Sequence, residues 1–172
     1  MVYFPKQTEP YQRRISDEEW DGHGPSSFRK LAFSTVEMAV ITGLLIRVFR
    51  AFLLTNAGND QPVLLGAGFL TGAVFLFAMV TLHLGNFPLR HWVWRAPLFA
   101  LLVAATEMAV SAGLIALGRE PLGTARATFA DWPGMAADVL MLRLAATSAY
   151  ALALAVIVQW TRTHSLRKAH RL

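Results

Sequence analysis

Four long apolar stretches dominate this 172-residue sequence and leave little freedom in what it can fold into. Each has the roughly 20 residues that an α-helix needs to cross the hydrocarbon core of a bilayer. Overall 55% of the residues are hydrophobic, and the 16% that are charged lie mostly outside the stretches. The stretches cover about residues 31–54, 63–84, 97–117 and 139–160. The sequence therefore predicts an all-α integral membrane protein, folded as a four-transmembrane-helix bundle.

The charged residues define the rest of the chain. Residues 1–26 form a polar N-terminal tail and residues 162–172 a basic C-terminal tail, so the membrane domain is expected to span residues 27–161. The N-terminal residues contain no apolar core of a signal peptide, and we expect the first apolar stretch to act as a signal-anchor. Neither tail is long enough to form a domain.

The lysine and arginine residues predict the orientation. With four spans, both tails share one side with the loop between the second and third stretches. That side carries eleven cations: Lys6, Arg13, Arg14, Arg29, Lys30, Arg90, Arg95, Arg162, Arg167, Lys168 and Arg171. The other side carries four: Arg47, Arg50, Arg119 and Arg126. The positive-inside rule places both termini in the cytoplasm, and we expect a bacterial inner membrane. Because the cations lie beside the spans, the sequence predicts no nucleic-acid partner.

Two segments resemble each other. Glu37-Met-Ala-Val is followed two residues later by Gly-Leu, and so is Glu107-Met-Ala-Val, at an offset of 70 residues. A second match comes at an offset of 71, where Asp60-Gln-Pro62 and Asp131-Trp-Pro133 precede the second and fourth stretches. This pattern indicates a tandem duplication of a two-helix hairpin, related by a pseudo-two-fold axis along the membrane normal.

Glu37 and Glu107 are the candidate site, because they are the acids that lie well inside the predicted spans. Each follows its expected helix start by 11 residues, roughly 16 Å of helix rise, which places both near mid-membrane. A carboxyl group at that depth must be protonated, paired or hydrated. The two could face each other as a proton or cation site, or each could hydrogen-bond to a neighbouring helix. Arg143 is the candidate counter-ion, although pairing with Asp138 or extension toward the outer surface is the favoured interpretation.

Small residues recur at four-residue spacing in every span, a pattern that lets helix backbones approach closely in lipid. We expect them to pack the bundle internally rather than to form a dimer interface. The predicted packing residues are Ala39, Gly43, Gly68, Gly72, Ala109, Gly113, Ala145 and Ala149.

Other chemistry finds no support in the sequence. There is no cysteine, and the five histidines form no pair at ligand spacing, so we expect no metal site and no cofactor. No nucleophile, base and acid combination is recognisable, and we expect a protein that is not an enzyme. Arg47 and Arg50 are interpreted as anchors at the outer interface.

Two functions fit these features. The favoured one is a non-enzymatic subunit or scaffold of a larger membrane assembly, with the lipid bilayer and other membrane protein subunits as partners. The alternative is a small oligomeric transporter or channel, coupled to protons or cations, that uses Glu37 and Glu107.

Overall fold

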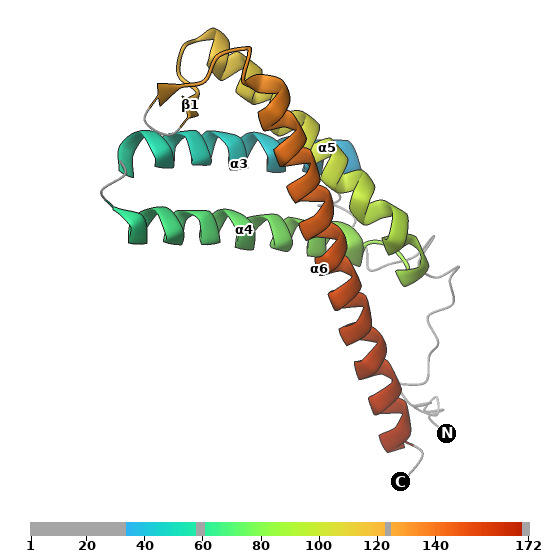
Figure 1. Ribbon diagram of the computed structural model, residues 1–172. Helices are drawn as coiled ribbons and strands as arrows, with labels where there is room; N and C mark the ends of the chain where they lie inside the picture. Colours follow the sequence, from blue (N-terminus) through green and yellow to red (C-terminus); the bar gives the residue numbers. More distant parts are fainter. Residues whose placement is uncertain (1–33, 58–60, 123–124, 170–172) are drawn as a thin grey trace, which may run out of the picture. The chain divides into compact units, whose positions relative to one another are not determined.

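The computed structural model describes residues 34–57, 61–122 and 125–169, and these contain four long helices. The chain divides into two units, Met1–Ala32 and Phe33–Leu172, and all the described residues belong to the second. The predicted N-terminal tail lies outside the described residues. The helices are α3 (Thr35–Ala57), α4 (Pro62–Gly85), α5 (Leu89–Ala116) and α6 (Trp132–Ala169) (Figure 1). All four are long and apolar enough to cross a membrane, which confirms the predicted all-α fold with four spans.

A two-stranded ribbon interrupts the connection between α5 and α6. Strands β1 (Pro121–Leu122) and β2 (Ala125–Arg126) pair in antiparallel fashion. Gly118 ends the helical path before them with a φ of 63°, a conformation that glycine adopts without steric cost. Strand β1 packs against α3.

Two helices extend beyond their predicted spans. Pro97 was expected to begin the third span, but α5 begins at Leu89 and Pro97 lies inside it. α6 begins at Trp132 and runs to Ala169, so it includes most of the segment that was predicted as a basic tail. Hydropathy locates the apolar part of a helix, whereas backbone hydrogen bonding continues into the polar turns on either side. Proline inside a spanning helix is tolerated because neighbouring groups can satisfy the freed carbonyl.

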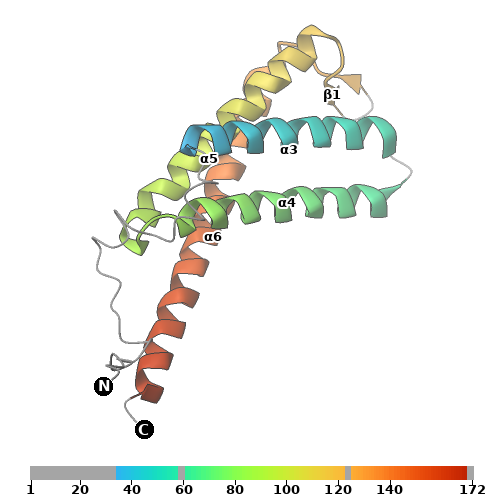
Figure 2. The ribbon, with the colours of Figure 1, turned by 180° about the vertical axis from the view of Figure 1, so that it is seen from behind.

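Helices α3 and α5 occupy the centre of the bundle. They pack against each other, α4 packs mainly on α3, and α6 packs on α5. Figures 1 and 2 show α3 and α4 running side by side and α6 lying next to α5 at the ribbon end. Two hairpins, α3–α4 and α5–α6, that pack through their first helices would give this arrangement. The duplication itself stays a prediction.

The core forms where α5 faces its neighbours. Phe99 and Val103 of α5 are completely buried, and Leu76 and Val80 of α4 belong to the same cluster. In lipid no hydrophobic effect draws helices together, so close van der Waals contact must stabilise them.

Glycine and alanine permit that contact at three of the predicted positions. A Cβ atom added at Gly43 would lie 2.6 Å from the carbonyl oxygen of Val103 on α5, and one at Gly68 would collide with the side chain of Leu53 on α3. Ala39 is fully buried.

The other five predicted packing residues do not pack inside the bundle. Added Cβ atoms at Gly72 and Gly113 would meet nothing within 4 Å. Ala109, Ala145 and Ala149 are exposed. Their stripes face away from the chain because Glu107, Ser111, Arg143 and Thr147 take the inward face of the same helices.

Gly43→Ala is therefore expected to lower the free energy of unfolding by about 1–3 kcal/mol, the usual cost of overpacking, because the new methyl group meets the backbone of α5. The measurement is reversible unfolding in mixed detergent micelles, followed by circular dichroism. Gly113→Ala is the matched control. It should be neutral or stabilising by up to about 1 kcal/mol, the difference in helix propensity. Equal effects of the two substitutions would refute the close approach of α3 and α5.

Candidate functional site: a buried charge network

Helix α5 carries the centre of the site. Glu107 and Ser111 are one helical turn apart, so they lie on the same face, and both are completely buried. Gly43 of α3 packs beside the backbone nitrogen of Glu107, and Arg47 follows Gly43 by one turn. The close approach at Gly43 therefore brings Arg47 level with Ser111.

Glu107 forms a two-point ion pair with Arg143 of α6. The Nε atom of Arg143 donates to Oε1 of Glu107 at 2.5 Å, and Nη2 donates to Oε2 at 3.0 Å. The Arg143 side chain is 14% exposed and that of Glu107 is fully buried. This parallel geometry is the strong form of a carboxylate–guanidinium contact. Arg143 is thus the partner of Glu107 rather than of Asp138, which corrects the favoured interpretation of the sequence.

A second buried ion pair joins α3 to the connection after α5. Nη2 of Arg47 donates to the hydroxyl oxygen of Ser111 at 2.9 Å and also contacts Oε1 of Glu120. Arg47 and Glu120 are both only 2% exposed. Arg47 was predicted to be an anchor at the outer interface, and this was wrong: its guanidinium is buried, where it contacts Ser111 of α5 and Glu120.

The two pairs form one network, which we call the charge network: Arg47, Glu107, Ser111, Glu120 and Arg143. The two pairs meet the same face of α5, where Glu107 and Ser111 lie one turn apart. Two positive and two negative charges offset each other, which reduces the cost of burying each of them. The Nε atom of Arg47 and Oε2 of Glu120 are buried without a hydrogen-bond partner among the described residues.

Glu37 does not belong to this network. It lies in the first turn of α3, exposed, where it forms a capping box with Ser34. The backbone N–H of Ser34 donates to Oε2 of Glu37 at 2.7 Å, and the backbone N–H of Glu37 donates to the Ser34 hydroxyl at 3.2 Å. The predicted equal depth of Glu37 and Glu107 was wrong, because α3 begins at Thr35, only two residues before Glu37.

The register between α3 and α5 also places Glu37 and Glu107 at different levels. Gly43 lies level with the stretch from Val103 to Glu107. Glu37 precedes Gly43 by six residues on a helix, so it lies well before the level of Glu107. The resemblance of the two sequence segments therefore does not extend to the environment of their glutamates.

Sequence reasoning missed Glu120 altogether. It lies outside the apolar stretch, only three residues beyond its predicted end at residue 117. One signal could have identified it: Glu120 and Arg47 both occur near the predicted outer ends of adjacent spans and have opposite charges. Ser34-Thr-Val-Glu37 could likewise have been recognised as a helix start, because Ser followed three residues later by Glu is the capping-box pattern.

Arginine is the partner of both carboxylates in the charge network. A guanidinium group stays charged at all physiological pH values, and each carboxylate of the network has one beside it. Within residues 34–57, 61–122 and 125–169, no group of three or more histidine or acidic residues is placed to hold a metal ion. His83 is buried but stacks on Phe99, with ring centroids 4.8 Å apart.

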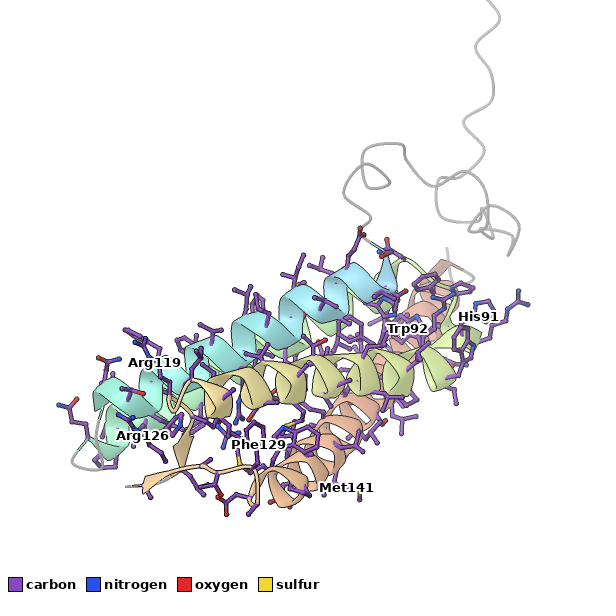
Figure 3. All side chains as sticks on the ribbon, turned by 90° about the horizontal axis from the view of Figure 1, so that it is seen from above. His91, Trp92, Arg119, Arg126, Phe129 and Met141 are labelled. Carbon is purple, nitrogen blue, oxygen red and sulfur yellow. The ribbon has the colours of Figure 1, made fainter. Side chains whose placement is uncertain are left out.

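The opposite ends of α5 differ in character. Figure 3 shows His91 and Trp92 at one end of α5, and Arg119 beyond the other end, where Arg126 belongs to strand β2 of the ribbon. The charge network lies in the ribbon half of α5.

No protein-family model matches the sequence, and the searches of curated proteins and of solved structures find no match either.

Proposed function

We propose that the protein is a non-enzymatic integral membrane subunit of a larger membrane assembly. In this proposal it lies in a bacterial inner membrane with both termini in the cytoplasm, as the distribution of lysine and arginine favours. The observation that carries the proposal is the charge network, in which the buried acids of the bundle are already engaged by arginines.

The outer faces of α5 and α6 support this proposal. Ala109 on α5 and Ala145 and Ala149 on α6 belong to small-residue stripes that are exposed rather than packed inside the chain. In a bilayer, such stripes are the surfaces on which a further helix packs closely. Helices α4 and α6 also leave most of their apolar surface uncovered. A subunit that meets other spanning helices would use these faces.

The transport alternative has less support. It uses Glu37 and Glu107 as an acid pair, whereas within one chain Glu37 caps the start of α3 and Glu107 binds Arg143. An arginine inside a pathway raises the barrier to protons and cations. The charge network therefore favours a static role.

The test is co-purification from native membranes in a mild detergent. We expect Ala149→Leu to reduce recovery of partner proteins at least fivefold, equivalent to about 1 kcal/mol of overpacking at a helix contact. The matched control is Met141→Leu, on the same helix and 68% exposed, which should leave recovery unchanged.

A photo-crosslinking side chain at position 149 gives an independent readout. Crosslinks to another membrane protein are expected from position 149 and not from position 74 on α4. Val74 is exposed but does not belong to a small-residue stripe. Exclusive labelling of lipid from position 149, with the chain purifying by itself, would rule out the subunit proposal.

A further inference from the structure

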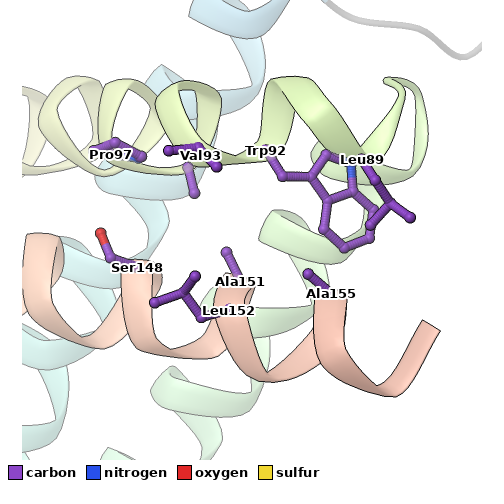
Figure 4. Close-up of a pocket in the computed structure, with 9 residues that line it drawn as sticks. Leu89, Trp92, Val93, Pro97, Ser148, Ala151, Leu152 and Ala155 are labelled. Carbon is purple, nitrogen blue, oxygen red and sulfur yellow. The ribbon is translucent and has the colours of Figure 1, made fainter. Parts of the chain in front are cut away.

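An apolar groove lies between the first turns of α5 and the middle of α6 (Figure 4). The side chains that line it are apolar except for the hydroxyl of Ser148 and the indole of Trp92, and the indole N–H already donates to the carbonyl oxygen of Phe87. Lipid chains and apolar side chains of another protein would fit such a groove equally well. The ribbon between α5 and α6 is more selective, because its exposed surface combines positive charges with large apolar side chains.

The position of the ribbon between two spanning helices fixes its level relative to the bilayer. One candidate span ends at Ala116 and the next begins at Trp132, so residues 117–131 connect them on one side of the membrane. A short connection that is anchored at both ends and paired as β1 and β2 stays close to the membrane surface. Its outer side chains therefore meet the headgroup region.

Arg119 and Arg126 lie on the outer face of the ribbon. Both are exposed, whereas their neighbours Glu120 and Ala127 are buried, and the backbone N–H of Ala127 donates to the carbonyl oxygen of Glu120. Because successive side chains of an extended chain point to opposite sides, the two arginines point away from the bundle. The Nη1 atom of Arg126 lies 3.8 Å from the position that a Cβ atom at Gly118 would take, so its guanidinium lies beside the residue that precedes Arg119 (Figure 3).

The two guanidinium groups are available to an anion from outside the chain. In the described part of the chain, neither Arg119 nor Arg126 makes an ion pair or a side-chain hydrogen bond. The acids next to them in the sequence are already engaged. Glu120 belongs to a buried ion pair, and Asp131 accepts hydrogen bonds from the backbone N–H and the hydroxyl of Thr128 at 2.9 and 2.7 Å.

Exposed apolar side chains accompany the arginines. Leu117 is 73% exposed and Leu122 is 41% exposed, which would be unfavourable in water. The interfacial region of a bilayer accepts apolar side chains beside cationic ones. A phospholipid offers both complements at one level, since its phosphate lies directly above the first carbons of its acyl chains.

We propose that the outer face of the ribbon binds anionic phospholipid, with the headgroup phosphates paired to Arg119 and Arg126 and with Leu117 and Leu122 among the upper acyl carbons. Arginine suits this contact because its planar guanidinium can donate two parallel hydrogen bonds to one phosphate. The contact requires no partner subunit and is therefore independent of the proposed function.

The test measures which lipids lie next to the ribbon of the full-length protein. Because the chain has no cysteine, Ala130→Cys at an exposed position can carry a single fluorophore. The protein is placed in phosphatidylcholine vesicles that contain a small fraction of lipid with a nitroxide near its headgroup. We expect nitroxide-labelled phosphatidylglycerol to quench the fluorophore more strongly than nitroxide-labelled phosphatidylcholine.

Two substitutions test the arginines. Arg126→Gln should lower the preference for phosphatidylglycerol about fivefold, because each arginine near the surface favours an anionic lipid by about that factor. Combining it with Arg119→Gln should abolish the preference. Lysine at both positions keeps the charges and should retain a preference. Arg90→Gln is the matched control: it removes an exposed cation near the start of α5 and should leave the quenching ratio at position 130 unchanged.

Three results would overturn the proposal. One is equal quenching by the two labelled lipids in the unmodified protein. Another is a preference that the double glutamine variant retains, which would mean that the arginines do not select the lipid. The third is crosslinking of position 130 to an acidic segment of another protein in native membranes without any lipid preference, which would assign the two arginines to a protein partner.

Discussion

Replacing Glu107 with leucine is expected to lower the free energy of unfolding by about 3–5 kcal/mol, the range for breaking a buried ion pair at one partner. The loss of the carboxylate leaves the Arg143 guanidinium without its two hydrogen bonds inside a spanning helix. Arg143→Leu should cost a similar amount, because it leaves the fully buried Glu107 carboxylate without its partner. Unfolding in mixed micelles provides the measurement.

The double variant Glu107→Leu, Arg143→Leu should recover most of that loss. Buried ion pairs replaced by apolar residues of similar volume are often as stable as the original, and leucine side chains need no partner in lipid. We expect the double variant to lie within about 1.5 kcal/mol of the unmodified protein. A double variant that loses as much as the sum of the single ones would show that the two residues do not form a pair.

Glu107→Gln distinguishes charge from hydrogen bonding in the same cycle. The amide oxygen can still accept one hydrogen bond from Arg143, but the negative charge is gone and the amide N–H₂ faces a guanidinium. The loss should therefore fall between that of the double variant and that of Glu107→Leu. Glu37→Gln is the matched control at an exposed position; it should cost only the weakening of a helix cap, about 0.5–2 kcal/mol at most.

The four spans followed from the sequence because a bilayer requires long apolar segments and the chain has four of them. The contacts of individual residues could be predicted only in part. Gly43, Gly68 and Ala39 pack as expected. The stripe at Ala145 and Ala149 has the same sequence spacing yet lies outside, because spacing alone does not tell which face of a helix its neighbours cover.

The charge network shows why the site was only partly predictable. Glu107 and Arg143 were both recognised, since an ionisable residue inside a span needs a reason to be there. Their pairing depends on the register between α5 and α6, which no local sequence rule fixes. Arg47 lies near the end of an apolar stretch, and this position fits an anchor at the membrane interface as well as it fits a buried ion pair. Only the close approach at Gly43 directs it inward to Ser111.

The Arg47–Glu120 pair should control whether the ribbon stays closed over the end of the bundle. Glu120 directly precedes β1, and its carbonyl oxygen accepts a hydrogen bond from the backbone N–H of Ala127 at 3.0 Å. Ala127 is only 6% exposed. Because the chain has no cysteine of its own, a single Ala127→Cys substitution reports opening of the ribbon through its rate of reaction with a water-soluble maleimide.

Arg47→Met is expected to raise that rate roughly a hundredfold, since stranding a buried carboxylate costs about 3 kcal/mol and each 1.4 kcal/mol is a factor of ten. Phe129→Cys is the matched control, because position 129 is 61% exposed and should react at one rate in both backgrounds. Combining Arg47→Met with Glu120→Leu removes both charges and should return the thiol at position 127 to slow labelling. If Arg47→Met leaves the labelling rate at position 127 unchanged, the ribbon is held by its own backbone hydrogen bonds. If it raises the rates at positions 127 and 129 together, the substitution has loosened the whole connection between α5 and α6 instead of the contact of Glu120 with α3.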